Sequence, residues 1–161
     1  MVSKAQYLHI IRWAEEKPFR KKLLCRLNQF LPFLLAGSYL ICLVLCFLVY
    51  PVFLVRLILR PAFCFLFVTV LRYILKFRRP YDVYGFVPIC GYHPGKNRSF
   101  PSRHAASAAI IALEIFHLWS SLGIILIIFA LLIGALRILC GNHFVKDVLA
   151  AYAIAFLLNI L

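Results

Sequence analysis

Two ionisable residues near the C-terminus, His143 and Asp147, stand four positions apart. On a helix this spacing makes two side chains neighbours on one face, where the carboxylate can hold one imidazole nitrogen and leave the other free. A histidine that acts as a nucleophile or a base needs such an orienting partner. The alternative is a buried pair that takes no part in chemistry. If the chain spans a membrane, however, burying ionisable groups there costs free energy, and such groups usually mark functional sites. The spacing therefore favours a reactive histidine.

A second cluster, Pro101-Ser102-Arg103-His104, directly precedes a long apolar stretch. A helix that begins here directs its free backbone N–H groups and the positive end of its dipole towards the preceding loop. Ser102 adds a hydroxyl donor, Arg103 adds a charge, and His104 can exchange a proton near neutral pH. Taken alone, Ser102 could be a plain N-cap and His104 an interfacial polar residue. Together these residue types predict an anion-binding site.

The third group lies at the end of the predicted second span and consists of Arg72, Lys76, Arg78, Arg79 and Pro80, while Arg137 belongs to the group of His143 and Asp147. A guanidinium group is planar, stays charged at any working pH, and offers paired donors that match the oxygens of a phosphate. A basic collar that anchors helix ends to lipid headgroups is the alternative for any one of these residues. The presence of all three groups in one chain favours the binding or cleavage of phosphate.

The elements that must position these residues are membrane helices. Of the 161 residues, 65% are hydrophobic and 14% are charged, which excludes a soluble core and a disordered chain. An apolar helix of about 20 residues crosses the hydrocarbon core of a bilayer. The sequence predicts an all-α integral membrane bundle with about five crossings, at residues 31–55, 62–75, 105–119, 122–139 and 144–161.

Five crossings place the three groups on one membrane face. The end of the second span, the start of the third, and the junction of the fourth and fifth lie on the same side, and residues 80–102 form a loop there. A turn at the other face is predicted at Arg56, Arg60 and Pro61. Glu114 approaches that other face, so we expect it to pair with Arg56 or Arg60.

The sequence divides into an N-terminal basic amphipathic segment, residues 1–30, and a membrane-embedded domain, residues 31–161. We expect the N-terminal segment to lie on the membrane surface and to remain in the protein, because the apolar run that follows is too long for a secretory signal. The net charge of +13 calls for anionic partners. Lipid headgroups and phosphate substrates fit better than nucleic acid, because the basic residues flank apolar spans.

The three groups resemble the motifs of the type-2 phosphatidic acid phosphatases, relatives of glucose-6-phosphatase and the vanadium haloperoxidases. The family pattern is Lys, six residues, Arg-Pro; then Pro-Ser-Gly-His; then Ser-Arg, five residues, His, three residues, Asp. The corresponding parts of this sequence are Arg72 with Arg79-Pro80, Pro101-Ser102-Arg103-His104, and Leu136-Arg137 with His143 and Asp147. The spacing is the same throughout. Three residues differ, since Arg72, Arg103 and Leu136 stand where the family has lysine, glycine and serine.

The resemblance implies a role for each matched residue. His143 would be the nucleophile that takes the phosphoryl group, Asp147 would orient it, and His104 would protonate the leaving oxygen. The phosphate would be held by Arg72, Arg79, Ser102, Arg103 and Arg137, with Lys76 as a possible stand-in for the usual lysine. The resemblance implies neither a metal nor another cofactor.

A site at the membrane surface suits a lipid phosphate such as phosphatidic acid, phosphatidylglycerophosphate or a polyprenyl diphosphate. The rival hypothesis is a catalytically inactive relative that binds anionic lipid. Few Lys or Arg residues lie on the face away from the site, which favours a cytoplasmic site by the positive-inside rule. Family members usually work on the opposite side, so both orientations stay open.

Overall fold

Helices make up all of the regular structure in residues 3–161, the part of the chain that this computed structural model describes. In chain order they are α1 (Lys4–Glu15), α2 (Pro18–Val49), α3 (Pro51–Leu75), α4 (Pro80–Tyr84), α5 (Arg103–Leu118), α6 (Ser120–Leu139) and α7 (Val145–Ile160). The predicted all-α bundle is confirmed. The predicted boundary at residue 30 falls within α2, which is continuous from Pro18.

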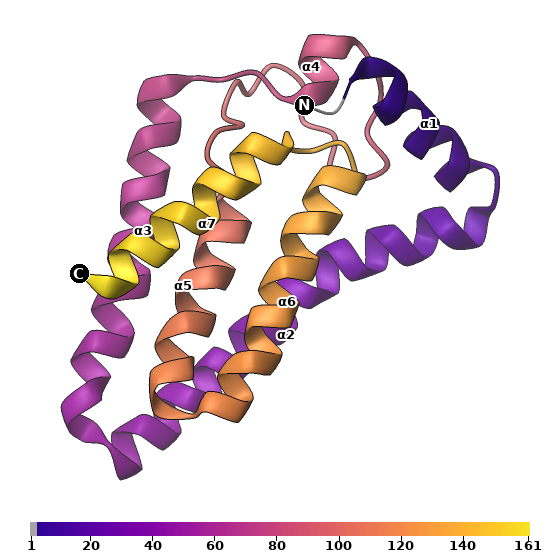
Figure 1. Ribbon diagram of the computed structural model, residues 1–161. Helices are drawn as coiled ribbons and strands as arrows, with labels where there is room; N and C mark the ends of the chain where they lie inside the picture. The colour runs from indigo at the N-terminus through magenta and orange to yellow at the C-terminus, as the bar shows by residue number, and fades with distance from the viewer. Residues whose placement is uncertain (1–2) are drawn as a thin grey trace.

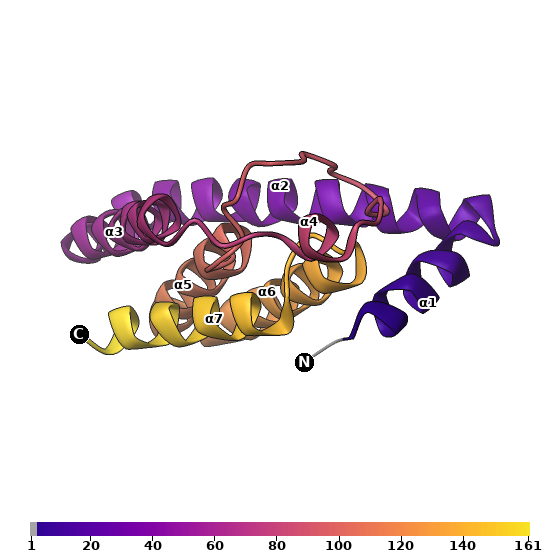
Figure 2. The same cartoon turned by 90° about the horizontal axis from the view of Figure 1, so that it is seen from above.

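The bundle is built around α5, which packs against α2, α3, α6 and α7 (Figures 1 and 2). Its buried positions include the small residues Ala105, Ala106, Ala108 and Ala112, which allow the backbones of neighbouring helices to approach closely. The long helix α2 lies behind α5 and α6 and extends beyond them towards α1. The first turn of α5 is thereby held where several other helices begin or end.

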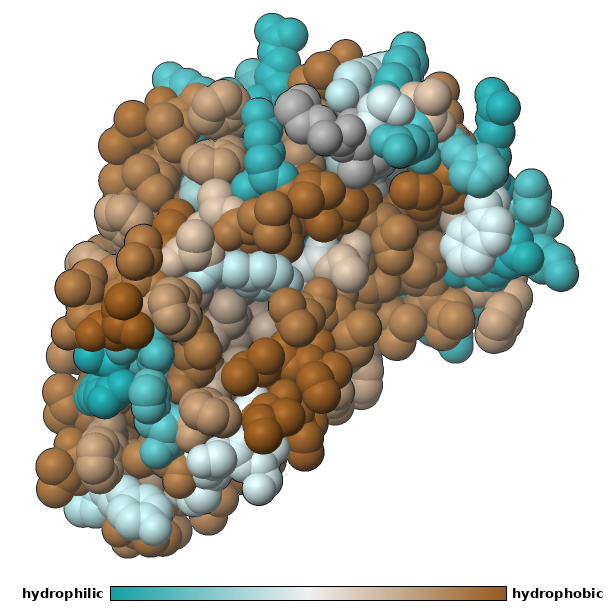
Figure 3. All heavy atoms as spheres, viewed as in Figure 1, coloured by the Kyte–Doolittle hydropathy of each residue, from teal (hydrophilic) through white to brown (hydrophobic). Residues whose placement is uncertain are grey.

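The outer surface of the bundle matches a lipid environment. Three stretches are long and apolar enough to cross a bilayer, namely Pro18–Val49, Pro51–Tyr84 and Ser120–Leu139. The helices α5 and α7 have 16 residues each, so each is about 24 Å long, and they pack beside these stretches. Hydrophobic residues cover most of the flank in Figure 3, whereas hydrophilic residues gather around α1 and α4. The predicted integral membrane location is confirmed.

The turn between the first two long helices is not where the sequence predicted it. The helix α2 ends at Val49 and α3 begins at Pro51, so the predicted span over residues 31–55 and the turn at Arg56, Arg60 and Pro61 are wrong. Pro51 occupies the first position of α3, where its missing N–H is not needed and its fixed φ suits a helix. Arg56 and Arg60 are helical residues that find a partner inside the bundle.

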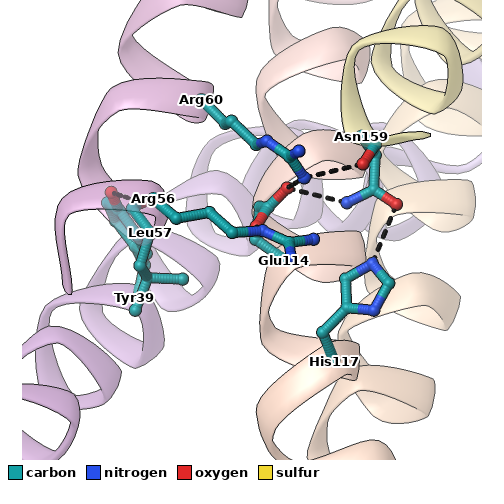
Figure 4. A network of polar contacts seen from close by, with 7 residues as sticks. All are labelled: Tyr39, Arg56, Leu57, Arg60, Glu114, His117 and Asn159. Carbon is teal, nitrogen blue, oxygen red and sulfur yellow. Dashed lines mark hydrogen bonds and ion pairs between the residues drawn. The ribbon is translucent and has the colours of Figure 1, made fainter. Parts of the chain in front are cut away.

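That partner is Glu114 on α5, which is almost completely buried. Its two carboxylate oxygens bind Arg56 Nε at 2.9 Å and Arg60 Nη1 at 3.1 Å (Figure 4). Asn159 of α7 donates its side-chain amide to the same carboxylate at 2.7 Å and contacts His117 Nε2 at 3.1 Å. The expected pairing of Glu114 is confirmed, and the network ties α3, α5 and α7 together far from the three predicted motifs.

The helix α1 folds back onto the protein. A capping box between Ser3 and Gln6 fixes its first turn. The buried residues of α1 are Tyr7, Ile11 and Ala14, and they pack in one apolar cluster with Phe86 and Phe144. Its apolar face therefore contacts the protein rather than lipid, while Lys4, Arg12 and Trp13 are exposed.

Candidate active site

The ends of four helices meet near α4 and carry most of the predicted site residues. Arg72 lies in the last turn of α3, His104 in the first turn of α5, and Arg137 in the last turn of α6. Ser102 is the N-cap of α5, Arg79 is the N-cap of α4, and Asp147 lies in the first turn of α7. Residues from three distant parts of the sequence are thus brought to one end of the bundle.

His143 and Asp147 form a buried pair. His143 Nδ1 lies 3.4 Å from Asp147 Oδ2, and the two residues are 2% and 0% exposed. The two do not share a helical face as predicted, because α7 begins at Val145 and His143 precedes it. Asp147 reaches back across the helix start, where Oδ2 also accepts a hydrogen bond from the Phe144 N–H at 3.0 Å. Since Nδ1 faces the carboxylate, Nε2 is the nitrogen available for attack on a substrate.

Ser99 completes this pair and was missed by the sequence reasoning. Its hydroxyl donates to Asp147 Oδ2 at 2.5 Å and lies 3.5 Å from His143 Nδ1, and the residue is fully buried. Ser99 lies three positions before Ser102 in an irregular loop, where no helical or strand periodicity predicts the direction of a side chain. The one signal in the sequence that could have indicated Ser99 is its position two residues before Pro101.

The charge state of His143 follows from its surroundings. Burial lowers the pKa of His143 to about 4, the hydrogen bond and negative charge of Asp147 oppose this, and the positive charges of Arg79 and Arg72 add to it. The imidazole is therefore neutral near pH 7, which is the form with a free lone pair.

The loop before α5 is tied to its neighbours through backbone atoms. Arg72 Nη1 donates to the Pro101 carbonyl at 2.8 Å and to the Ser99 carbonyl at 3.4 Å. The Ser102 N–H donates to the Asp147 carbonyl at 2.9 Å. These bonds join α3, α5 and α7 directly. Arg72 therefore uses one end of its guanidinium group to hold the loop.

Several buried donors at this end of the bundle have no protein partner within residues 3–161: Ser102 Oγ, Arg79 Nε and Arg137 Nε. Buried polar groups are nearly always hydrogen-bonded, to protein, water or ligand. Electrostatic interactions also connect His104 with His143, Arg137, Arg103 and Arg72. Unused donors and clustered positive charge are what an anion such as phosphate requires.

Two predicted phosphate ligands have other surroundings. Lys76 is exposed at the C-cap of α3, where its φ of 49° is left-handed, and it lines a pocket whose other residues include Arg78, Lys146 and Asp147. The guanidinium of Arg103 lies over the ring of Phe65, 5.0 Å from its centroid. Arg103 is thus directed towards α3, on the side of a large apolar cavity.

This cavity has a volume of about 670 Å³ and lies between α2, α3 and α5. It follows α5 from Arg103 and His104 to Ile111, and the facing residues are largely apolar, including Leu35 and Phe65. A cavity of this size and character accommodates a hydrocarbon chain. His104 lies where the cavity meets the cationic end of the bundle.

A family model described as the PAP2 superfamily matches residues 50–161. The chain belongs to this superfamily. The resemblance inferred from the three motifs is therefore confirmed, as is the predicted class of enzyme, a membrane lipid phosphatase. Helices α1 and α2 lie outside the matched residues.

Solved structures of other proteins share this fold. One is a transmembrane PAP2-type phosphatidylglycerolphosphate phosphatase from Bacillus subtilis, with a TM-score of 0.74, 22% identity, and coverage of 97% of this chain and 82% of that one. Another is Aquifex aeolicus LpxE, with a TM-score of 0.67, 27% identity, and coverage of 95% and 92%. A search of the curated proteins finds none that matches this sequence.

Proposed function

We propose that this PAP2 protein hydrolyses the phosphate of a membrane lipid through a phosphohistidine intermediate on His143. The observation that carries the proposal is the buried Ser99–Asp147–His143 chain, in which Nδ1 is held 3.4 Å from a carboxylate and Nε2 is left for the substrate. Unpartnered donors from Ser102, Arg79 and Arg137 lie at the same end of the bundle.

In the first step, the Nε2 lone pair of His143 attacks phosphorus, and the bond between phosphorus and the lipid oxygen breaks. His104, which carries its second proton when the anionic phosphate is bound beside it, gives that proton to the oxygen, which leaves as a lipid alcohol or, from a diphosphate, as a lipid monophosphate. The position of His104 on the wall of the apolar cavity supports this role, because the leaving group carries the hydrocarbon chain. Asp147 stabilises the positive charge that develops on the imidazole.

In the second step, water attacks the phosphorus atom of phosphohistidine while His104 accepts a proton from that water. The P–N bond breaks, inorganic phosphate leaves, and His143 returns to its neutral form. The transferred group spreads its charge over three oxygens, so the main catalytic requirement is fixed positive charge. In this proposal that charge comes from Arg72, Arg79 and Arg137, with Arg103 at the cavity side.

In this proposal the arginine side chains supply the positive charge, and the reaction needs no metal. The proposed substrate is a lipid phosphate of the phosphatidic acid, phosphatidylglycerophosphate or polyprenyl diphosphate class. The apolar cavity supports a lipid, and one structural neighbour is named as a phosphatidylglycerolphosphate phosphatase.

Phosphate release from these three lipids, measured with purified protein in detergent micelles and excess EDTA, tests the proposal. We expect wild-type protein to release phosphate from at least one lipid, and His143→Ala to lose activity by about 10³-fold or more. His117→Ala is the matched control, because His117 binds Asn159 at the far network. Equal release by wild type and His143→Ala would overturn the proposal and favour a protein that only binds anionic lipid.

A further inference from the structure

Tyr7 of α1 is completely buried beside the proposed nucleophile, although α1 lies outside the residues that match the family model. Its hydroxyl donates a hydrogen bond to the backbone carbonyl of His143 at 3.0 Å. The two residues are 136 positions apart in the sequence, so this contact is a product of the fold. It joins an N-terminal helix to the turn between α6 and α7.

The ring of Tyr7 is held by aromatic neighbours. It stacks on Phe86 with ring centroids 5.5 Å apart and meets the edge of Phe144 at 6.3 Å. Ile11 and Ala14, on the same face of α1, extend the apolar cluster. The capping box at Ser3 fixes the turn that precedes Tyr7. A buried aromatic ring with fixed neighbours has one orientation, so the direction of its hydroxyl is set.

The other backbone hydrogen bonds at His143 are made by N–H groups. Its N–H donates to the Arg137 carbonyl at 3.2 Å, and the next N–H, that of Phe144, donates to Asp147 Oδ2. The His143 carbonyl precedes α7 and accepts its hydrogen bond from Tyr7. Burial is the main reason that the pKa of the Tyr7 hydroxyl is raised, with the charge of Asp147 adding to it, so the hydroxyl remains a donor at every working pH.

We propose that Tyr7 is a positioning residue of the active site, which holds the backbone of His143 so that its imidazole stays between Asp147 and the substrate. Helix α1 then contributes a positioning residue to the catalytic centre and does not act as a surface anchor alone. The inference rests on the proposed role of His143 as the nucleophile. A small shift of the nucleophile costs rate, because attack requires the reacting atoms to be aligned.

Tyr7→Phe tests this role, because it removes the hydroxyl and keeps the packed ring. The matched control is Tyr152→Phe, which removes a hydroxyl bond of the same kind, from Tyr152 to the Ala130 carbonyl at 2.8 Å, between α6 and α7. Both variants are assayed with the best lipid phosphate in micelles. We expect Tyr7→Phe to lower kcat about tenfold with KM within twofold, and Tyr152→Phe to keep both values within twofold.

The pH profile of kcat/KM provides a second measurement. A loss of stability alone lowers the amount of active protein but does not shift the pH at which activity declines. The charged and titratable groups that interact with His143 are Asp147 from α7, Arg79 at the N-cap of α4, Arg72 from α3 and His104 from α5, and both variants keep all four. In Tyr7→Phe the turn loosens and water reaches the imidazole, so we expect the acidic limb to move from about pH 4 towards the ordinary histidine value of about 6.5. In Tyr152→Phe it stays in place.

The outcomes separate this inference from the proposed function. If His143→Ala is inactive but Tyr7→Phe matches Tyr152→Phe in kcat and in pH profile, Tyr7 only contributes to packing and the inference is overturned. If His143→Ala retains full activity, the proposed function itself fails. A selective loss of kcat together with a shifted acidic limb in Tyr7→Phe supports the positioning role.

Discussion

Ser99→Ala removes one hydroxyl from the centre of the proposed catalytic chain. In the wild-type protein, Asp147 Oδ2 accepts hydrogen bonds from Ser99 Oγ at 2.5 Å and from the Phe144 N–H at 3.0 Å. The other oxygen, Asp147 Oδ1, is buried without a hydrogen-bond partner among residues 3–161. After the substitution, the Phe144 N–H and the His143 imidazole still contact the carboxylate, but the hydroxyl donor is gone.

The expected loss follows from the charge of the acceptor. A hydrogen bond to a charged group contributes about 1.5–3 kcal/mol. Because the Phe144 N–H remains in place, we expect the lower end of this range, about 1.5 kcal/mol. Each 1.36 kcal/mol of transition-state stabilisation corresponds to about tenfold in rate. Ser99→Ala should therefore lower kcat/KM by about tenfold.

The assay is the initial rate of phosphate release in micelles, at several substrate concentrations, with thermal unfolding measured on the same samples. Ser38→Ala is the control, because Ser38 Oγ bonds the Leu34 carbonyl on the exposed side of α2 and touches no site residue. A folded Ser99→Ala protein whose kcat/KM stays within twofold of wild type would refute the role of Ser99 in holding Asp147.

Three further predictions concern stability, pH and packing. Glu114→Ala leaves Arg56 and Arg60 without their buried carboxylate, so we expect a loss of about 3 kcal/mol, seen as a lower Tm in detergent; an unchanged Tm contradicts this. Burial lowers the pKa of His143 to about 4, so we expect an NMR titration of its imidazole to centre near pH 4. A titration centred near pH 6.5 would show that His143 is not buried as described. Gly134→Ala places a Cβ 2.7 Å from Val148 Cγ1 and against the Tyr152 hydroxyl, so α6 and α7 must separate. We expect it to lower the free energy of unfolding by about 1–3 kcal/mol, and a wild-type Tm would argue against this packing.

The convergence of the three motifs was predictable because it depends on topology alone. Apolar runs fix where the helices cross the bilayer, and charged residues at their ends fix which ends share a face. The His143–Asp147 contact was also predicted from spacing. Its geometry differs, because the aspartate reaches back over the start of α7 instead of along a helical face.

The contacts that support the pair could not be predicted from local sequence. Ser99 lies in an irregular loop, and Tyr7 reaches His143 from the opposite end of the chain. The break at Tyr50 was missed because Arg56 and Arg60 resembled the end of a span, whereas Glu114 satisfies them within the bundle. Each of these features depends on a partner distant in sequence, and periodicity and spacing carry no information about such partners.

Trapping the covalent intermediate tests the central claim most directly. Wild-type protein is mixed with a lipid carrying ³²P in its terminal phosphate, quenched in alkali within milliseconds, digested and mapped, with His143→Ala as the control. The mechanism predicts acid-labile label on the peptide that contains His143 and none in the variant. Label on another residue, or phosphate release without any labelled protein, would contradict it.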